Sequence, residues 1–414
     1  MRDRGGKFLR ASYFLTFASA ALILLSITAS QWALWSALAL LGASRARWRI
    51  PHIWLPLALF MAGTVLSLVF SPEPLHGLPQ IRKLLVFTML AAVYSTFRDA
   101  AAARRLFLCW FAIGGAVSCL ALAQFGERWR QSEAQHVPFY NFYVTQRITG
   151  TMSHWMTFAG QEMVVLLMLL AFLLFAPVAG RRAWALCLAG TAVLGVALLL
   201  NETRTVWLGV AAGGAWLLWW WKRWMTVAGP AVVLLAMWLA PGPIHERLVS
   251  IFKPQKNVDS NEFRRIARGT GLRMIRAHPL LGIGLDETKY HFLDYLPPDA
   301  PHPLPPGYYQ HLHNVYLQYA AERGIPTLLM MLWLLARVVH DFWRALRKLP
   351  AGRSAERFLL QGGIATVIGI MVSGLYEVNL GDTEVLTAFL VVVACGYVAA
   401  GGRREDGATV SAAP

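Results

Sequence analysis

Long apolar stretches alternate with short polar segments along most of the chain. Several of these stretches contain no charged residue and are about as long as the roughly 20 apolar residues that span a bilayer. The pattern therefore predicts an all-α polytopic membrane protein with about twelve transmembrane helices, of which the first two are short enough to form a tight hairpin. We expect the spans near residues 12–28, 31–43, 53–70, 82–97, 104–125, 156–176, 183–200, 205–221, 225–240, 314–340, 358–376 and 384–401.

The composition supports a membrane protein and excludes a simple soluble domain. Of the 414 residues, 57% are hydrophobic and 14% are charged, whereas soluble proteins carry about 25% charged residues. The first apolar run begins near Ser12 and is followed at once by a second. A cleaved signal peptide does not show this pattern, so we expect the N-terminus to be retained. The four cysteines lie inside apolar runs, which favours buried small side chains over a disulfide or metal framework.

The distribution of basic residues predicts which ends of the helices face the cytoplasm. Alternate connections are short and rich in Lys and Arg, and the segment 341–357 alone carries five such residues. Short basic loops stay in the cytoplasm, so the net charge of +16 indicates topology and both termini are expected there. We expect residues 1–414 to form a single transmembrane domain, with a long, partly helical periplasmic loop at 241–313 between the ninth and tenth spans. The remaining predicted periplasmic segments are 71–81, 126–155, 201–205 and 376–384.

Several arginines depart from this charge rule because they lie on the predicted periplasmic side. Arg147 precedes the sixth span, Arg204 lies in a tight turn, and Arg82 opens the fourth span. A single arginine there could simply meet a lipid phosphate. Several arginines that converge from separate loops instead favour a diphosphate-bearing lipid, because guanidinium groups present forked donors to phosphate oxygens.

The segment 262–277 carries five further arginines. Arg265, Arg268, Leu272 and Arg276 follow helical spacing and share one face. Arg264 and Arg273 point elsewhere, so only part of this set of arginines can meet one ligand. The glycines and proline of "HPLLGIG" then predict a turn.

Two histidines lie where a polar loop leads into the tenth span. Asn314 is a suitable N-cap, so His313 lies at the start of a helix, where the helix dipole disfavours imidazolium. A neutral histidine can act as a general base, although a hydrogen-bonded interfacial histidine would show the same pattern. His311 is a candidate supporting residue.

Metal binding by these histidines is the alternative that we set aside. His291 and His302 lie in the same loop, but the loop has no cysteine, and a zinc site needs further ligands at compatible spacing. No Asp-x-Asp pattern occurs in the chain, so arginines would have to stabilise a diphosphate in place of a metal. We therefore expect no metal and no cofactor.

The motifs resemble those of bacterial O-antigen ligases, in the wider group that includes O-antigen polymerases and bacterial protein O-oligosaccharyltransferases. The resemblance covers most of residues 80 to 380, and the last of its four motifs is the most specific. The motifs are "QRITGTMSHWMTFAG" (146–160), "NETRTVWLGV" (201–210), "RRIARGTGLRMIRAHPLLGIG" (264–284) and "HLHNVYLQYAAERGIPTLLMM" (311–331).

The resemblance implies a metal-independent, GT-C-like membrane glycosyltransferase of the bacterial inner membrane with a periplasmic active site. Such a ligase transfers a polysaccharide from undecaprenyl diphosphate to a sugar hydroxyl of lipid A–core and inverts the anomeric configuration. By position, His313 would be the base, and Arg265 and Arg204 would hold the diphosphate with Arg147, Arg82 and Arg268. The arginine doublet permits either Arg264 or Arg265. His311, Asn314 and Glu377 would be supporting residues.

Three other functions remain open at this stage. An O-antigen polymerase or a protein O-oligosaccharyltransferase would use the same donor with another acceptor. We favour the ligase because the chain ends soon after the last span. A lipid-linked glycan transporter belongs to a different class. It would place ionisable residues at mid-membrane depth, but Glu162 is the main ionisable residue within the predicted spans.

Overall fold

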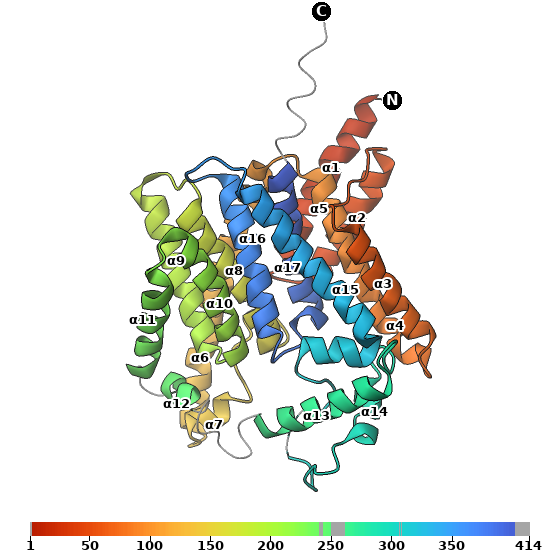
Figure 1. The fold of residues 1–414 in the computed structure, drawn as a ribbon. Coiled ribbons are helices and arrows are strands. Elements are labelled where there is room, and N and C mark those ends of the chain that lie inside the picture. The colour runs from red at the N-terminus through yellow and green to blue at the C-terminus, as the bar shows by residue number, and fades with distance from the viewer. Residues whose placement is uncertain (1, 240–242, 250–260, 306, 308, 402–414) are drawn as a thin grey trace, which may run out of the picture.

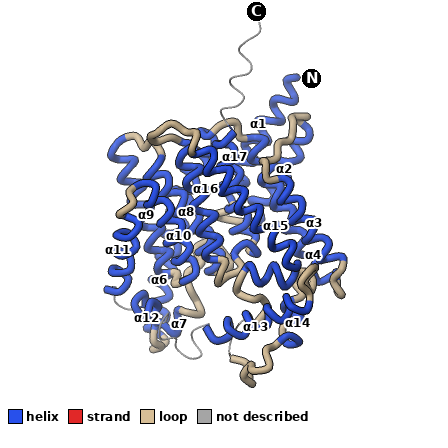
Figure 2. Tube along the Cα trace, in the orientation of Figure 1, coloured by secondary structure: helices blue, strands red, loops and turns tan. Residues whose placement is uncertain are grey.

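The computed structural model describes residues 2–239, 243–249, 261–305, 307 and 309–401. These residues form helices and loops without any strand (Figure 2). The α-helices are α1 Arg2–Leu22, α2 Ile27–Ala43, α3 Trp54–Val69, α4 Pro74–Ile81, α5 Thr88–Thr96, α6 Ala100–Ala134, α7 Phe139–Tyr143, α8 Trp155–Phe175, α9 Gly180–Leu200, α10 Arg204–Trp221, α11 Met225–Leu239, α12 Pro243–Val249, α13 Asn261–Ala277, α14 Thr288–His291, α15 Val315–Leu346, α16 Ala355–Ser373 and α17 Thr383–Gly401. The 3-10 helices are η1 Arg82–Phe87, η2 Leu293–Tyr295 and η3 Asn379–Gly381.

The helices agree with an all-α multi-pass membrane protein. A helix lies over each of the expected spans, although η1 and α5 together fill the fourth. Among the described helices, six are long and apolar enough to cross a membrane: α6, α8, α9, α15, α16 and α17. The helices α2, α3 and α11 are apolar but shorter. Twelve crossings and a GT-C-like arrangement remain predictions.

The first two helices form the hairpin that the sequence allowed, with different ends. α1 begins at Arg2 and ends at Leu22, whereas we expected a span over 12–28. The chain turns inside an apolar stretch because Ser26 caps α2 by accepting a hydrogen bond from the Ala29 backbone N–H. Ser19 and Ser30 join the two helices through buried hydrogen bonds.

The helices α8, α16 and α17 form the centre of the bundle. Most of their residues are buried, and α16 packs against α8, α10 and α17. The helices α9 and α11 lie at the periphery, where most of their apolar side chains are exposed. Exposed apolar side chains on these outer helices fit a surface that lipid covers.

The two ends of the bundle differ in structure. The first turn of α1 and the last turn of α17 lie at one end, and α7, α12, α13 and α14 lie at the other (Figure 1). The predicted loop 241–313 contributes α12, α13, α14 and η2 to this second end. Residues 241–242, 250–260, 306 and 308 of that loop, and the C-terminal residues 402–414, lie outside the described residues.

A break in α15 provides the place where the turn after α13 packs against the bundle. Gly324 has φ +79°, which divides α15 into a short first part and a long second part. The turn after α13 lies against this break: Ile283 N–H donates to the Ala321 carbonyl (2.8 Å), and Ile325 N–H donates to the Pro279 carbonyl (2.8 Å). A Cβ atom at Gly324 would overlap the Leu280 carbonyl. The glycine is therefore required by backbone-to-backbone contact as well as by its conformation.

Candidate functional site

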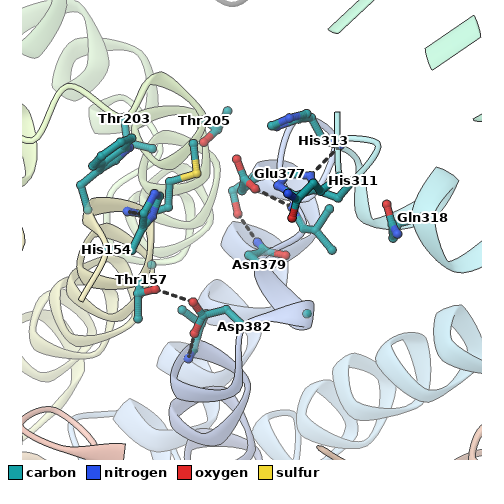
Figure 3. Close-up of a pocket in the computed structure, with 18 of the residues that line it drawn as sticks. His154, Thr157, Thr203, Thr205, His311, His313, Gln318, Glu377, Asn379 and Asp382 are labelled. Carbon is teal, nitrogen blue, oxygen red and sulfur yellow. Dashed lines mark hydrogen bonds between the residues drawn. The ribbon is translucent and has the colours of Figure 1, made fainter. Parts of the chain in front are cut away.

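A cavity of about 1060 Å³ lies where α12 and α13 meet the first turns of α10 and α15. The loop before α8, the segment 286–289, the segment 373–385 and the residues Gln80 and Lys83 also line it. The walls carry many histidine, arginine and carboxylate side chains, and Figure 3 shows several of them pointing toward one another. The five segments that were expected on the periplasmic side all contribute to the second end of the bundle or to this cavity.

The start of α15 holds His313 in a fixed position. Asn314 caps the helix, because its side chain accepts a hydrogen bond from Leu317 N–H (2.9 Å). The Asn314 amide donates to the Leu375 carbonyl (2.8 Å), and Val315 N–H donates to the Gly374 carbonyl (2.9 Å). His313 is 6% exposed with φ +49° and lines the cavity. Its position is thus set jointly by α15 and by the loop after α16.

His311 supports His313 directly. The His313 backbone N–H donates to Nδ1 of His311 (3.1 Å), and the two ring centroids are 3.9 Å apart. Burial, together with the positive charges of Arg264 and His154, lowers the pKa of His311 to about 4. His311 is therefore a neutral hydrogen-bond acceptor at physiological pH. Phe263 covers the other side of His313, with ring centroids 4.9 Å apart in an edge-on arrangement.

Glu377 brings a carboxylate to the two histidines. It is 9% exposed, and its Oε1 accepts a hydrogen bond from Val378 N–H (3.0 Å). Its Oε2 is buried without a hydrogen-bond partner among the described residues. Burial raises the pKa of Glu377, while the nearby charges of Arg264 and His154 oppose the shift. The buried oxygen is available to a ligand in the cavity.

His311, His313 and Glu377, which we call the histidine–glutamate group, have the geometry of a possible metal site. One ligand atom from each residue lies within 4.8 Å of the other two. Two imidazoles and a carboxylate are a known set of ligands for catalytic zinc. Both histidines lie in the loop at 241–313, and the third ligand comes from the segment after α16. This geometry makes the metal requirement an experimental question.

Four arginines from four segments line another part of the cavity, and we call them the arginine cluster. They are Arg147 before α8, Arg204 at the start of α10, Arg247 on α12 and Arg264 on α13.

The turn between α9 and α10 organises two members of the cluster. Arg247 Nε donates to the Glu202 carbonyl (3.1 Å), and its Nη1 donates to the Tyr140 hydroxyl (3.0 Å). Arg147 Nη1 reaches the same carbonyl at 3.5 Å, and its guanidinium lies over the Trp155 ring. Glu202 has φ +56°, which turns its carbonyl toward both arginines. This local geometry explains why the short "NETRT" segment belongs to the site.

Burial makes the arginine cluster a strong site for an anion. Burial, followed by the neighbouring charge of Arg247, lowers the pKa of Arg147 to about 10. Burial, opposed by Glu377, also lowers the pKa of Arg264. Both side chains remain charged at neutral pH, but their charges are poorly solvated. The carboxylates of Glu202 and Glu377 offset part of this cost. A bound diphosphate would add further negative charge, and forked guanidinium donors match its oxygens.

The structure brings most of the expected site residues to one cavity. His313, His311, Glu377, Arg147 and Arg204 line it. Asn314 lies behind them as the cap of α15. The remaining three arginines are exposed and do not line the cavity: Arg82, Arg265 and Arg268.

The orientation of α13 explains the position of Arg265 and Arg268. Phe263, Ile266, Ala267 and Met274 form the buried face of this helix, against Leu312 and Ala321. The face that carries Arg265 and Arg268 therefore points to solvent, and Arg264 is the member of the doublet that reaches the cavity. At the opening of the fourth span, Lys83 rather than Arg82 lines the cavity.

The basic cavity residues that were not expected from the sequence as site residues include Arg247, His154, Lys83 and Arg323. His154 and Arg323 lie inside the quoted motifs, so the motifs contained a signal that we did not use. Arg247 lies in a polar segment whose helix and orientation are not visible in the apolar pattern.

Residues 189–332 match the model of the O-antigen ligase family. The match covers about a third of the chain and supports a member of the O-antigen ligase and polymerase superfamily. This match contains the arginines of α10, α12 and α13, both histidines and the broken first part of α15, so the family region includes about half of the cavity wall. Arg147 and Glu377 lie outside it. No curated protein matches the chain.

This family match confirms the resemblance found in the motifs. The family implies an activity related to glycosyl transfer, with lipid-linked glycans among its substrates. The apolar helices agree with a membrane protein that meets such lipids.

Proposed function

We propose that the chain is an O-antigen ligase of the bacterial inner membrane, with both termini cytoplasmic and the cavity facing the periplasm. It transfers a polysaccharide from undecaprenyl diphosphate to a sugar hydroxyl of lipid A–core. The observation that carries this proposal is the meeting of a histidine with a buried arginine cluster in one cavity. Arg264 connects the two, because its charge acts on His311, Glu377 and Arg247.

The reaction is one displacement at the anomeric carbon. His313 accepts the proton of the acceptor hydroxyl, and the oxygen attacks the anomeric carbon from the face opposite the diphosphate. The bond from that carbon to the diphosphate oxygen breaks, and undecaprenyl diphosphate leaves with the electron pair. A single displacement inverts the anomeric configuration.

The arginine cluster acts on the leaving group. Negative charge on the bridging oxygen increases as the bond breaks, and fixed donors aimed at this charge stabilise the transition state. Arg147, Arg204, Arg247 and Arg264 supply such donors. Binding both lipids in one cavity removes the entropy cost of their encounter, which can contribute several kcal/mol.

A parallel acceptor test separates this proposal from its alternatives. Purified protein and a radiolabelled prenyl-diphosphate glycan would be incubated with lipid A–core, with a second prenyl-linked glycan, or with an acceptor protein. We expect product with lipid A–core alone. Product with only the second glycan would identify a polymerase, and product with only the protein would identify a protein O-oligosaccharyltransferase. Movement of the labelled lipid between leaflets without any transfer would identify a transporter.

Ligation is expected to continue in excess EDTA, because the arginine cluster neutralises the diphosphate. Initial rates would be compared before and after chelation and after addition of Zn²⁺, Mg²⁺ or Mn²⁺. We expect rates within about twofold of the untreated protein, since metal-independent charge stabilisation comes from the arginines. A rate that falls on chelation and returns with one of these ions would assign the histidine–glutamate group to a metal.

A further inference from the structure

A second pair of basic residues lies at another part of the cavity. Lys83 of η1 and Arg323 of α15 both line it, beside the first residues of α17. Neither belongs to the arginine cluster. The positive charge of Arg323 acts on Lys83, and so do the opposite charges of Glu322, Asp382 and Asp286. We call them the second basic pair.

Arg323 is a buried cation with unused hydrogen-bond donors. It is 9% exposed, and its guanidinium carbon lies 4.0 Å from the centroid of the Tyr319 ring. Its Nε and Nη1 are buried without a hydrogen-bond partner in the part of the chain that the structure describes. Burial of a charge without such partners is costly. A stacked aromatic ring compensates only in part, since it offers no acceptor oxygen.

The neighbouring carboxylates already have their own donors. Glu322 accepts hydrogen bonds from the Gln318 amide (2.7 Å) and from Asp286 N–H (3.2 Å). Asp286 forms an ion pair with Lys289 at 2.6 Å. Asp382 accepts from the Thr157 hydroxyl and from two backbone N–H groups at the start of α17. Glu384 also lines this part of the cavity, but within the described ranges no ion pair joins any carboxylate to Lys83 or Arg323.

The backbone holds the second basic pair in place. Arg323 directly precedes the break at Gly324, which the turn after α13 clamps by backbone hydrogen bonds. Lys83 Nζ donates to the Gly381 carbonyl, which ties η1 to η3. Both cations are therefore held at the cavity wall before any ligand arrives, so a ligand meets them at little ordering cost.

We propose that Arg323 and Lys83 form a second phosphate-binding subsite, which holds a phosphoryl group of the acceptor lipid while the arginine cluster holds the donor diphosphate. The proposal rests on the proposed function, because transfer requires donor and acceptor in the cavity together. Two separate groups of buried or partly buried cations in one cavity match two separately charged lipids. An acceptor phosphate on Arg323 would supply the acceptors that its Nε and Nη1 lack, and Lys83 would add a point charge.

The test compares acceptors with and without phosphate in the purified full-length protein. The variants are Arg323→Gln, the conservative Arg323→Lys, Lys83→Gln and, as a matched control, the exposed Arg268→Gln on α13. For Arg323→Gln we expect the KM for phosphorylated lipid A–core to rise at least about tenfold, since charge-assisted contacts of this kind contribute more than 1 kcal/mol. The KM for the donor should change less than twofold, and Arg323→Lys should recover part of the loss.

Dephosphorylated lipid A–core provides the decisive comparison. With the unmodified protein its KM should be raised to a similar extent, and Arg323→Gln or Lys83→Gln should raise it no further. Equal effects of the variants on both acceptors would overturn the proposal. A rise in the donor KM instead would assign the second basic pair to the donor. Arg268→Gln should leave both KM values unchanged.

Two controls keep the result interpretable. Size-exclusion chromatography and thermal unfolding would show whether Arg323→Gln folds; if it does not, Lys83→Gln with the two acceptors decides the question.

A protein that transfers only to a second prenyl-linked glycan would refute the ligase assignment, but the phosphate subsite could still be tested in it. The acceptor phosphate would then be varied between diphosphate and monophosphate, and an Arg323-dependent preference for the diphosphate is expected.

Discussion

Replacement of His313 by alanine is expected to lower the rate of ligation by about 10²- to 10⁴-fold, the usual contribution of a general base. The acceptor hydroxyl would then have to lose its proton to water during the attack. Donor binding should change little, because the arginine cluster holds the diphosphate and remains intact. The rate would be measured with purified protein, and donor binding would be measured separately with the labelled prenyl-diphosphate glycan.

A second histidine on the same side of the molecule provides the control for this variant. His278 follows α13, is exposed and does not line the cavity. We expect His278→Ala to ligate at nearly the unmodified rate. More than a small residual activity in His313→Ala, in a preparation that binds donor normally, would remove His313 from the role of base. Loss of donor binding would instead point to a collapse of the start of α15.

Arg264→Gln is expected to lower kcat/KM for the donor by about 10²- to 10³-fold, as removal of one donor to a developing anion does in other enzymes. Arg264 lines the cavity and its charge acts on Arg247, His311 and Glu377. The variant replaces the guanidinium by a shorter neutral amide, so the loss would reflect the missing charge and its hydrogen-bond donors. Steady-state kinetics over a range of donor concentrations would measure it.

The adjacent Arg265→Gln is the matched control, since it removes the same charge from the same helix. Arg265 is exposed and outside the cavity, so we expect a change of about twofold or less, as for other surface contacts. Equal losses in both variants would show that the net charge of α13 matters rather than a contact in the cavity. A greater loss in Arg265→Gln would return the diphosphate role to Arg265.

The helices could be predicted from the sequence because apolar stretches of sufficient length have few alternatives in a membrane. Their ends were harder to predict. α6 continues to Ala134, well past the predicted end at 125, because its polar last turns extend the helix beyond the apolar run. The cap at Ser26 lies within an apolar stretch, where a hydropathy pattern shows no boundary.

Site residues could be predicted from the sequence only where a single segment of the chain determines their position. His313 and its cap Asn314 are consecutive, so the helix start was visible in the sequence. The choice between Arg264 and Arg265 depends on how α13 rotates against Leu312 and Ala321, which are remote in sequence. The contact of Glu377 with the histidines likewise depends on α15 and α16 packing together. Tertiary packing decided these positions, and no local spacing encodes it.

The backbone contact between Gly324 and Leu280 affects how loss-of-function mutations in this protein should be read. The contact joins two arms of the chain: α13 with the turn that follows it, which carries Arg264, and the start of α15 with the loop before it, which carries His313. Any side chain at Gly324, or at Gly282 against Glu322, would push these arms apart. A genetic screen for inactive variants would therefore recover these glycines together with His313. Membrane abundance of each variant would distinguish a misassembled loop from lost chemistry.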